Sequence, residues 1–385
     1  MISFNQWLVA LGCGLALAAP AQAAAGTEAS SPKRGQAAPA SGQSERRLIF
    51  VVIDGVRWQE VFRGADPRIA GDLRRDRDPA RIRRAYLADD RPAQALTPFL
   101  HSLPAQGGAL TGDRDHDTCL RVGNRYWFSY PGYNEMLTGR TDSWANTNDA
   151  VPNPDISFLE WANRQPGYAG RVRAYATWDN FRNILSTGRS GIPVNAPARP
   201  LPASGPADGD ARTHAMALRS VNEEDPAVLF VVYGDSDHFA HIGRYEDYLD
   251  QIHRVDGYLR DLWSAAQANP RWAGRTTLIV TTDHGRGRAD LDNEAWRHHG
   301  SGFDASPDYK PEELEPGSDQ TWAAYLGPRP AVATAKPSAT LWPCPTSSQL
   351  AATALDALGM AWRDFNPSMS SPLFAPPEGG DGGGK

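Results

Sequence analysis

The sequence predicts an α/β protein built on a mostly parallel sheet that helices cover on both faces. Four short apolar runs are typical of buried strands, and they span residues 48–52, 172–177, 227–233 and 276–281. A helix is expected between the last two runs, because apolar residues recur every three or four positions through 244–267. Strands that alternate with helices in this way form parallel sheets with a helical layer on each side.

The remaining elements are shorter and are separated by long irregular loops. Thr97 followed by Pro98 predicts the start of a helix that ends near Gly107. Residues 320–326 predict a further strand, and residues 347–358 a late helix. With 36 glycines and 31 prolines, these two residue types exceed their usual combined share of about 12%.

The length and charge of the chain exclude several classes of protein. A chain of 385 residues has room for one elaborated domain or two. Its 39 basic and 45 acidic residues leave a net charge of −6. This balance predicts no surface for nucleic acid or anionic membranes, and the oligomeric state stays open.

The two ends of the chain predict export and a single folded domain. The apolar run 7–19 precedes the small-residue site Ala21-Gln22-Ala23, although no Lys or Arg comes before it. This pattern predicts a signal peptide over 1–23, cleaved after Ala23, and a periplasmic or secreted protein. No second run of this kind follows, so we expect no stable membrane anchor. Composition predicts a disordered linker over 24–46, one domain over 47–368 and a disordered tail over 369–385.

Two cysteines remain after the predicted cleavage. Cys119 and Cys344 form an even pair in a chain that we expect to reach an oxidising compartment. The pair is interpreted either as a disulfide that closes a long loop or as two buried free thiols. The sequence favours neither.

Potential metal ligands follow two of the predicted strands. Asp54-Gly55 comes after the strand 48–52, and Asp283-His284-Gly285 follows the strand 276–281. A carboxylate and an imidazole at the end of a strand can reach one ion, as zinc ligands do. The alternatives are an ordinary Asp-Gly turn at Asp54 and a helix cap beside a surface histidine at Asp283.

A third cluster follows the strand 227–233. Asp237 and His241 are four residues apart, which places both side chains on one face of a helix and also suits a loop. His238 is an alternative ligand, whereas His253 lies in the predicted amphipathic helix and is interpreted as packing or surface. His299 in the segment RHHGSG adds a further imidazole, with His298 as its alternative.

A serine hydroxyl lies in a segment that the sequence predicts to be a loop leading into a helix. Ser129 precedes Tyr130-Pro131, and proline suits a first helical turn. A helix N-terminus attracts phosphate and other anions, so Ser129 is a candidate nucleophile. Taken alone, the segment favours the interpretation that Ser129 is only the helix cap.

The order of these motifs along the chain resembles that of the alkaline phosphatase superfamily. The series is Asp after a strand, Ser-x-Pro, Asp-x-x-x-His, Asp-His-Gly after a strand and His-Gly. The branch that it resembles contains the nucleotide pyrophosphatase/phosphodiesterase-like and phosphoglyceromutase-like proteins. The resemblance covers about 48–360, and it implies an alkaline phosphatase-like fold over one metal-dependent hydrolase domain.

The resemblance implies a role for each candidate residue. Ser129 takes the position of the nucleophile, which also contacts metal, and Asn148 the position of an amide that binds phosphoryl oxygens, with Asn146 as its alternative. Two divalent metal ions are implied, Zn²⁺ by the mixed Asp and His ligands or Mn²⁺. Two ligand sets are expected, Asp54, Asp283 and His284 for one ion and Asp237, His241 and His299 for the other.

The function that the resemblance implies is hydrolysis of a small phosphate monoester or diester through a phosphoserine. Arg57 and Arg125 are expected either to bind phosphate oxygens or to be ordinary surface charges. A formylglycine sulfatase is disfavoured, because Tyr133 stands where the sulfatase pattern has Arg. The alternatives are the same fold acting on sulfate or phosphonate esters or as a phosphotransferase, and an inactive metal-binding domain.

Overall fold

Strand β1 (Arg47–Ile53) lies at the centre of a seven-stranded sheet, and both of its faces are buried. Side chains alternate across a strand, so Ile49, Val51 and Ile53 enter one apolar core, whereas Leu48 and Phe50 enter the other. A strand buried on both faces reads as a continuous apolar run, which explains why the sequence pattern predicted it.

The computed structural model describes residues 45–71, 76–88, 90–196, 208–303, 314–328, 332–333 and 344–375. The sheet order is β2-β9-β7-β1-β6-β4-β5. Five neighbouring strands, β7, β1, β6, β4 and β5, run parallel, while β9 is antiparallel to both β7 and β2. The strands are β1 (Arg47–Ile53), β2 (Ala109–Thr111), β3 (Leu120–Arg121), β4 (Val172–Ala176), β5 (Val194–Asn195), β6 (Val228–Tyr233), β7 (Thr276–Thr281), β8 (Gln320–Thr321), β9 (Ala323–Leu326), β10 (Val332–Ala333) and β11 (Phe374–Ala375).

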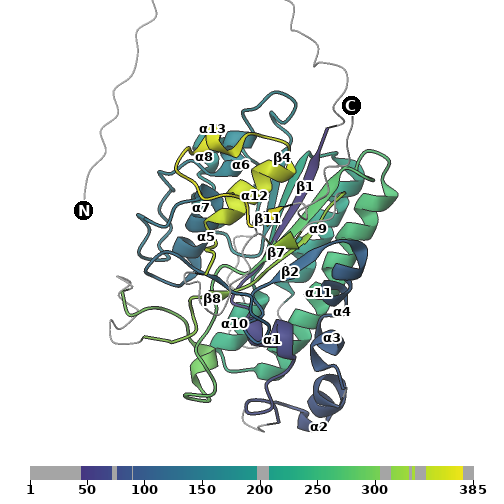
Figure 1. Ribbon diagram of the computed structural model, residues 1–385, viewed down its shortest axis with the longest axis vertical. Coiled ribbons are helices and arrows are strands. Elements are labelled where there is room, and N and C mark those ends of the chain that lie inside the picture. Colours follow the sequence, from purple (N-terminus) through teal and green to yellow (C-terminus); the bar gives the residue numbers. More distant parts are fainter. Residues whose placement is uncertain are drawn as a thin grey trace, which may run out of the picture. The chain divides into compact units, whose positions relative to one another are not determined.

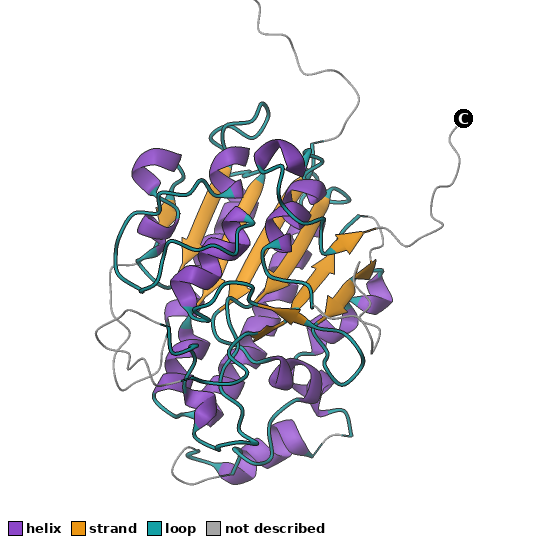
Figure 2. Cartoon of the chain, turned by 60° about the vertical axis from the view of Figure 1, so that its left-hand side comes forward, coloured by secondary structure: helices purple, strands orange, loops and turns teal. Residues whose placement is uncertain are grey.

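Helices cover both faces of the sheet, as the sequence predicted (Figures 1 and 2). One face packs against α1 (Trp58–Arg63), α4 (Pro98–Ser102), α9 (Gly209–Glu223) and α11 (Tyr245–Ala268). The other packs against α5 (Ser129–Thr138), α6 (Phe158–Ala162), α7 (Phe181–Ile184) and α12 (Gln349–Ala357). The remaining helical segments are α2 (Pro79–Ile82), η1 (Arg83–Leu87), α3 (Pro92–Leu96), η2 (Pro104–Gln106), α8 (Thr187–Ser190), α10 (Asp235–His241), η3 (Ala295–Arg297) and α13 (Trp362–Phe365).

The structure confirms the predicted fold class and most of the predicted elements. The expected strand over 320–326 is divided into β8 and β9, because Trp322 separates the two pairings. The packed chain also continues past residue 368, where the domain was expected to end. Leu373 and Phe374 are buried, and β11 pairs with β10. The predicted signal peptide and nearly all of the linker lie outside the described residues.

No helix within the described ranges is both long and apolar enough to span a bilayer. This observation concerns only the described part of the chain.

Cys119 and Cys344 form a disulfide, which resolves the choice that the sequence left open. Their Cα atoms are 5.5 Å apart, although the residues are 225 positions apart in the chain. The bond joins the segment next to β3 to the segment that precedes α12. Because α12 packs against α5, the cross-link restrains the helical layer that carries Ser129.

Replacing both cysteines with serine is expected to lower the free energy of unfolding by about 2–5 kcal/mol, because the long loop is no longer closed in the unfolded chain. Chemical denaturation of the oxidised wild-type protein and of the double variant measures this difference. Reduced wild-type protein is the control and should match the variant. A difference below about 0.5 kcal/mol, the usual effect of a surface substitution, would contradict a stabilising role.

Candidate active site

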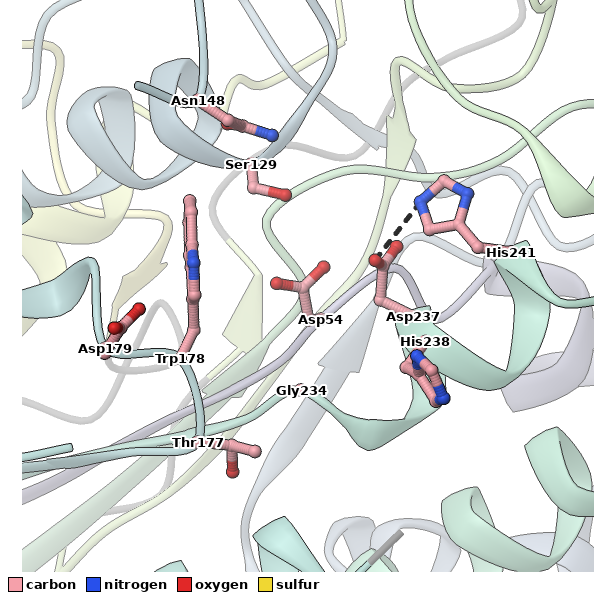
Figure 3. Close-up of a pocket in the computed structure, with 10 residues that line it drawn as sticks. All are labelled: Asp54, Ser129, Asn148, Thr177, Trp178, Asp179, Gly234, Asp237, His238 and His241. Atoms are coloured by element: carbon pink, nitrogen blue, oxygen red, sulfur yellow. Dashed lines mark ion pairs between the residues drawn. The ribbon is translucent and has the colours of Figure 1, made fainter. Parts of the chain in front are cut away.

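Three neighbouring strands bring three of the predicted clusters together at one edge of the sheet. Asp54 follows β1, Asp237 follows β6, and Asp283 follows β7. Parallel strands end at the same edge, so residues far apart in the sequence meet there. Asp54 and Asp237 line one cavity at this edge (Figure 3).

The turn after β1 fixes the carboxylate of Asp54. Gly55 has a φ of 62°, and a Cβ at this position would lie 2.7 Å from Oδ1 of Asp237. Only glycine permits both the backbone conformation and the close approach of the second carboxylate. The hydroxyl of Tyr133 on α5 donates a hydrogen bond of 2.7 Å to Oδ2 of Asp54. The other oxygen, Oδ1, faces His284.

The turn after β7 orients Asp283 and His284 toward Asp54. The backbone N–H of Gly55 donates to Oδ1 of Asp283 over 3.1 Å. Nδ1 of His284 donates to the carbonyl of Gly285 over 2.8 Å, which leaves Nε2 as the ring nitrogen that can bind a metal. Nε2 lies 3.5 Å from Oδ1 of Asp54 and 3.3 Å from Oδ2 of Asp283.

Two buried carboxylate oxygens show that these residues fit a cation. Oδ1 of Asp54 and Oδ2 of Asp283 are buried and have no hydrogen-bond partner among the described residues. A buried charge without compensation is costly. Both oxygens lie around Nε2 of His284, so a divalent cation bound here would compensate them.

A second set of ligands lies beside the first. The spacing of four puts Asp237 and His241 on one face of α10, and Nε2 of His241 is 3.2 Å from Oδ2 of Asp237. His299 comes from the segment after η3, and its Nε2 lies 3.0 Å from Nε2 of His241. Their ligand atoms are close enough to hold one metal ion.

Of the two triads implied by the resemblance, Asp237, His241 and His299 also form a candidate group in the structure, whereas the group around Asp54 has a different membership. Asp54, Asp237 and His284 also place ligand atoms within 4.8 Å of one another. Asp237 therefore contributes to both candidate groups, while Asp283 adjoins His284. The carboxylate of Asp237 is shared because the turn at Gly55 brings β1 against α10.

The pKa values reflect the crowding of carboxylates and imidazoles. Burial and then the charge of Asp54 raise the pKa of Asp283 well above its usual value. Burial alone would lower the pKa of His284, but Asp283 and Asp54 raise it to about 9. Burial would raise the pKa of Asp237, yet the charges of His241 and Arg286 hold it well below its usual value. These opposed shifts are typical of a functional site.

Arg286 is a buried residue of the site that the sequence did not reveal. Its Nη2 is paired with Oδ1 of Asp237, and its Nε donates to the carbonyl of Gly55 over 3.0 Å. Nη1 donates to the carbonyl of Arg297 over 2.8 Å. Arg286 thus links α10, the turn after β1 and the segment that leads to His299. Its position directly after Asp283-His284-Gly285 was the available indication.

Ser129 is the first residue of α5, and its hydroxyl faces the metal ligands. Oγ of Ser129 lies 3.3 Å from Nε2 of His284. The helix reaches this place because Gly132 packs against the turn after β7, where a Cβ would lie 2.5 Å from the carbonyl oxygen of Asp283. The positive end of the helix dipole favours an anion beside Ser129, although Asn148 accepts from the N–H of Tyr130 and Pro131 has no N–H.

Asn148 lines the same cavity, whereas Asn146 is not among its lining residues. Oδ1 of Asn148 accepts a hydrogen bond of 2.9 Å from the backbone N–H of Tyr130. Its amide nitrogen is therefore oriented away from the helix and can donate to a ligand. Asn180 holds the segment by donating to the Asn148 carbonyl over 3.1 Å.

The cavity has a volume of about 450 Å³, which suits a small molecule. Figure 3 shows Asp237 and His241 on one side of Asp54 and Trp178 on the other. Thr177, Trp178 and Asp179 follow β4, and no ligand or nucleophile pattern in the sequence indicated them. The lining residues are Asp54, Ser129, Asn148, Thr177, Trp178, Asp179, Gly234, Asp237, His238 and His241.

A buried carboxylate supports the floor of this cavity. Asp210, in the first turn of α9, accepts hydrogen bonds from the hydroxyl of Thr177 over 2.6 Å and from the N–H of Gly234 over 2.8 Å. Gln251 of α11 donates to its other oxygen over 2.7 Å. Asp210 therefore joins the end of β4 to the start of α10, where Asp237 lies.

Four other candidates lie outside this cavity. Arg57 is buried and paired with Glu60, so it is not a surface charge. Arg125 is exposed and stacks over Phe303. His253 on α11 contacts the carbonyl of Leu96, as expected of a packing residue. His298 belongs to neither candidate metal group.

Replacing Tyr133 with phenylalanine is expected to weaken metal binding about 10- to 100-fold, because Asp54 loses the partner that orients it. Competition with a chelator measures the change in affinity. The thermal unfolding midpoint of the metal-free protein is the control for folding, since the ring remains packed against Phe181. Unchanged affinity in a folded variant would contradict this role.

Comparisons with known proteins agree with the fold and the motifs. Residues 120–300 match the family model of type I phosphodiesterase / nucleotide pyrophosphatase. The C-terminal periplasmic domain of EcEptC from Escherichia coli, in a complex with Zn, superposes with a TM-score of 0.53 and 13% identity, over 87% of this chain and 89% of that one. Phosphonate monoester hydrolase of Agrobacterium radiobacter gives 0.51 and 14%, over 82% and 74%. No curated protein sequence matches the chain.

The family matched over 120–300 consists of enzymes that hydrolyse phosphate esters, and the fold agrees with this match. The order of the motifs, the sheet and the match over 120–300 confirm the resemblance to the alkaline phosphatase superfamily, with its nucleotide pyrophosphatase/phosphodiesterase branch. The solved structures are too distant in sequence to show more than a shared fold.

Proposed function

We propose that the protein is a metal-dependent phosphodiesterase that forms a phosphoserine at Ser129. The observation that carries this proposal is the position of Oγ of Ser129, 3.3 Å from Nε2 of His284, at a helix N-terminus that opens into the cavity. A hydroxyl beside two groups of metal ligands is the arrangement expected of a phosphoryl-transfer site.

Asp54, Asp237, His241, Asp283, His284 and His299 would hold two divalent ions. Mixed carboxylate and imidazole ligands favour Zn²⁺, and Mn²⁺ is the alternative. When bound, such ions lower the pKa of a nearby hydroxyl and stabilise the charge on the attacking and leaving oxygens.

The residues of the cavity would act in two successive displacements at phosphorus. Oγ of Ser129 loses its proton and attacks phosphorus, which forms the Oγ–P bond and breaks the bond to the leaving alcohol. The leaving oxygen takes up a proton. The amide nitrogen of Asn148 donates a hydrogen bond to a non-bridging phosphoryl oxygen. In the second step, water attacks phosphorus in line and the Oγ–P bond breaks. The phosphate monoester is released, and Oγ of Ser129 takes up the proton that the attacking water loses.

The cavity lining favours a diester over a monoester. Among the residues that the structure describes, those that line the cavity include no Lys or Arg. A diester carries one negative charge, whereas a monoester carries a second charge for which this lining offers no cationic side chain. We therefore propose the diester as the preferred substrate and the monoester as a slower one.

We further propose that the protein acts in the periplasm or outside the cell. The apolar run 7–19 with its small-residue site supports export. The bond between Cys119 and Cys344 suits an oxidising compartment.

A substrate panel tests the proposed function. The full chain is loaded with Zn²⁺ or Mn²⁺ and given bis-p-nitrophenyl phosphate, p-nitrophenyl phosphate and p-nitrophenyl sulfate. We expect the highest kcat/KM for the diester. Preference for the sulfate ester would overturn the proposal, and preference for the monoester would overturn its diester part.

A further inference from the structure

The cavity contains one carboxylate that neither candidate metal group uses. Asp54, Asp179 and Asp237 all line it, but only Asp54 and Asp237 belong to those groups. Asp179 is exposed, and no ion pair to its carboxylate occurs within the described residues. The basic side chains in the described lining of the cavity are those of His238 and His241. Asp179 thus adds negative charge at the side of the cavity away from the ligands.

Trp178 presents a fixed aromatic wall next to this carboxylate. Its indole meets the ring of Phe181 edge to face, with centroids 6.1 Å apart, and Phe181 is buried. Figure 3 shows the indole between Asp54 and Asp179. A substrate group that extends from the phosphate past Asp54 therefore meets the indole first and Asp179 beyond it. Aromatic faces attract organic cations.

We propose that Trp178 and Asp179 form a subsite for an organic cation, so that the preferred substrates are phosphodiesters of an ammonium-bearing alcohol. The inference rests on the proposed function, because it places the diester phosphate beside Ser129. The indole supplies a cation–π contact, and the Asp179 carboxylate supplies the opposite charge at its outer edge. A diester with a second anionic group in this subsite is disfavoured by the same carboxylate.

Binding of two matched diesters tests this subsite. The probes are p-nitrophenyl phosphorylcholine and p-nitrophenyl 3,3-dimethylbutyl phosphate, in which carbon replaces the quaternary nitrogen. Titration calorimetry with the metal-loaded Ser129→Ala chain measures both affinities without turnover. We expect the cationic diester to bind about three- to tenfold more tightly, which is the combined effect of an exposed cation–π contact and an exposed ion pair.

Variants in the same Ser129→Ala background assign the preference to residues. Asp179→Asn is expected to reduce it about threefold. Asp149→Asn removes an equal charge close to Asn148 but outside the cavity lining, and it should leave the preference intact. Trp178→Leu should reduce the preference, and Trp178→Phe should retain part of it, because phenylalanine keeps an aromatic face.

Equal binding of the two diesters would overturn the inference, as would the absence of measurable binding by the cationic one. Identical preferences in Asp179→Asn and Asp149→Asn would overturn the role of Asp179. The proposed function fails by a different result, namely that the wild-type chain with metal hydrolyses neither diester.

Discussion

The Ser129→Ala variant is expected to lose at least about a thousandfold in kcat, because a covalent mechanism then lacks the hydroxyl that attacks phosphorus. Its metal content should stay close to that of the wild-type protein. The ligands that we assign to the two groups come from other segments, and Oγ of Ser129 contacts only Nε2 of His284 among them. Release of p-nitrophenolate from the diester and metal analysis of the same sample measure both quantities.

A matched control separates the lost nucleophile from a general effect of removing a hydroxyl. Ser102→Ala removes one on α4, on the opposite face of the sheet from α5, and should retain full activity. A Ser129→Ala variant that stays active would show that the attacking group is another one, with metal-bound water as the first alternative.

The Asp237→Asn variant is expected to lose both metal and activity. Asp237 is the carboxylate common to the two candidate groups, so its substitution weakens both at once. Removing a residue that only orients a metal ligand lowers metal affinity or activity about 10- to 100-fold. Removing a direct ligand that both groups share should therefore lower kcat/KM at least about a hundredfold. Asparagine keeps the shape of the side chain beside Arg286. Metal content per chain and diester hydrolysis measure the loss.

Asp149→Asn serves as the control for this variant, because it makes the same chemical change just outside the cavity lining. Full metal occupancy in Asp237→Asn would remove this residue from the ligand set. Loss of metal with undiminished hydrolysis would instead show that hydrolysis does not require the bound metal.

The sequence predicted the site well where it follows one simple pattern, a chemical residue directly after a buried strand. Asp54 and Asp283 were found in this way, and the structure places them together because β1 and β7 are neighbours. Applied to β4, the same pattern would have indicated Trp178 and Asp179. They were missed because a tryptophan beside an aspartate is not a ligand pattern.

Other features depend on tertiary contacts that no spacing encodes. The sharing of Asp237 between two groups follows from the approach of Gly55 to α10. The hydrogen bond from Tyr133 to Asp54 joins α5 to the end of β1. Arg286 is buried only because three backbone carbonyls and Asp237 surround it. The pairing of Cys119 with Cys344 likewise needs two segments that meet only in the folded chain.

Diester hydrolysis as a function of bound metal tests the central claim most directly. The full wild-type chain is stripped with a chelator and then titrated with Zn²⁺ or Mn²⁺, while bound metal and p-nitrophenolate release are measured in each sample. We expect activity to disappear in the stripped protein and to return in proportion to the metal bound. Undiminished hydrolysis by a fully stripped chain would contradict the account.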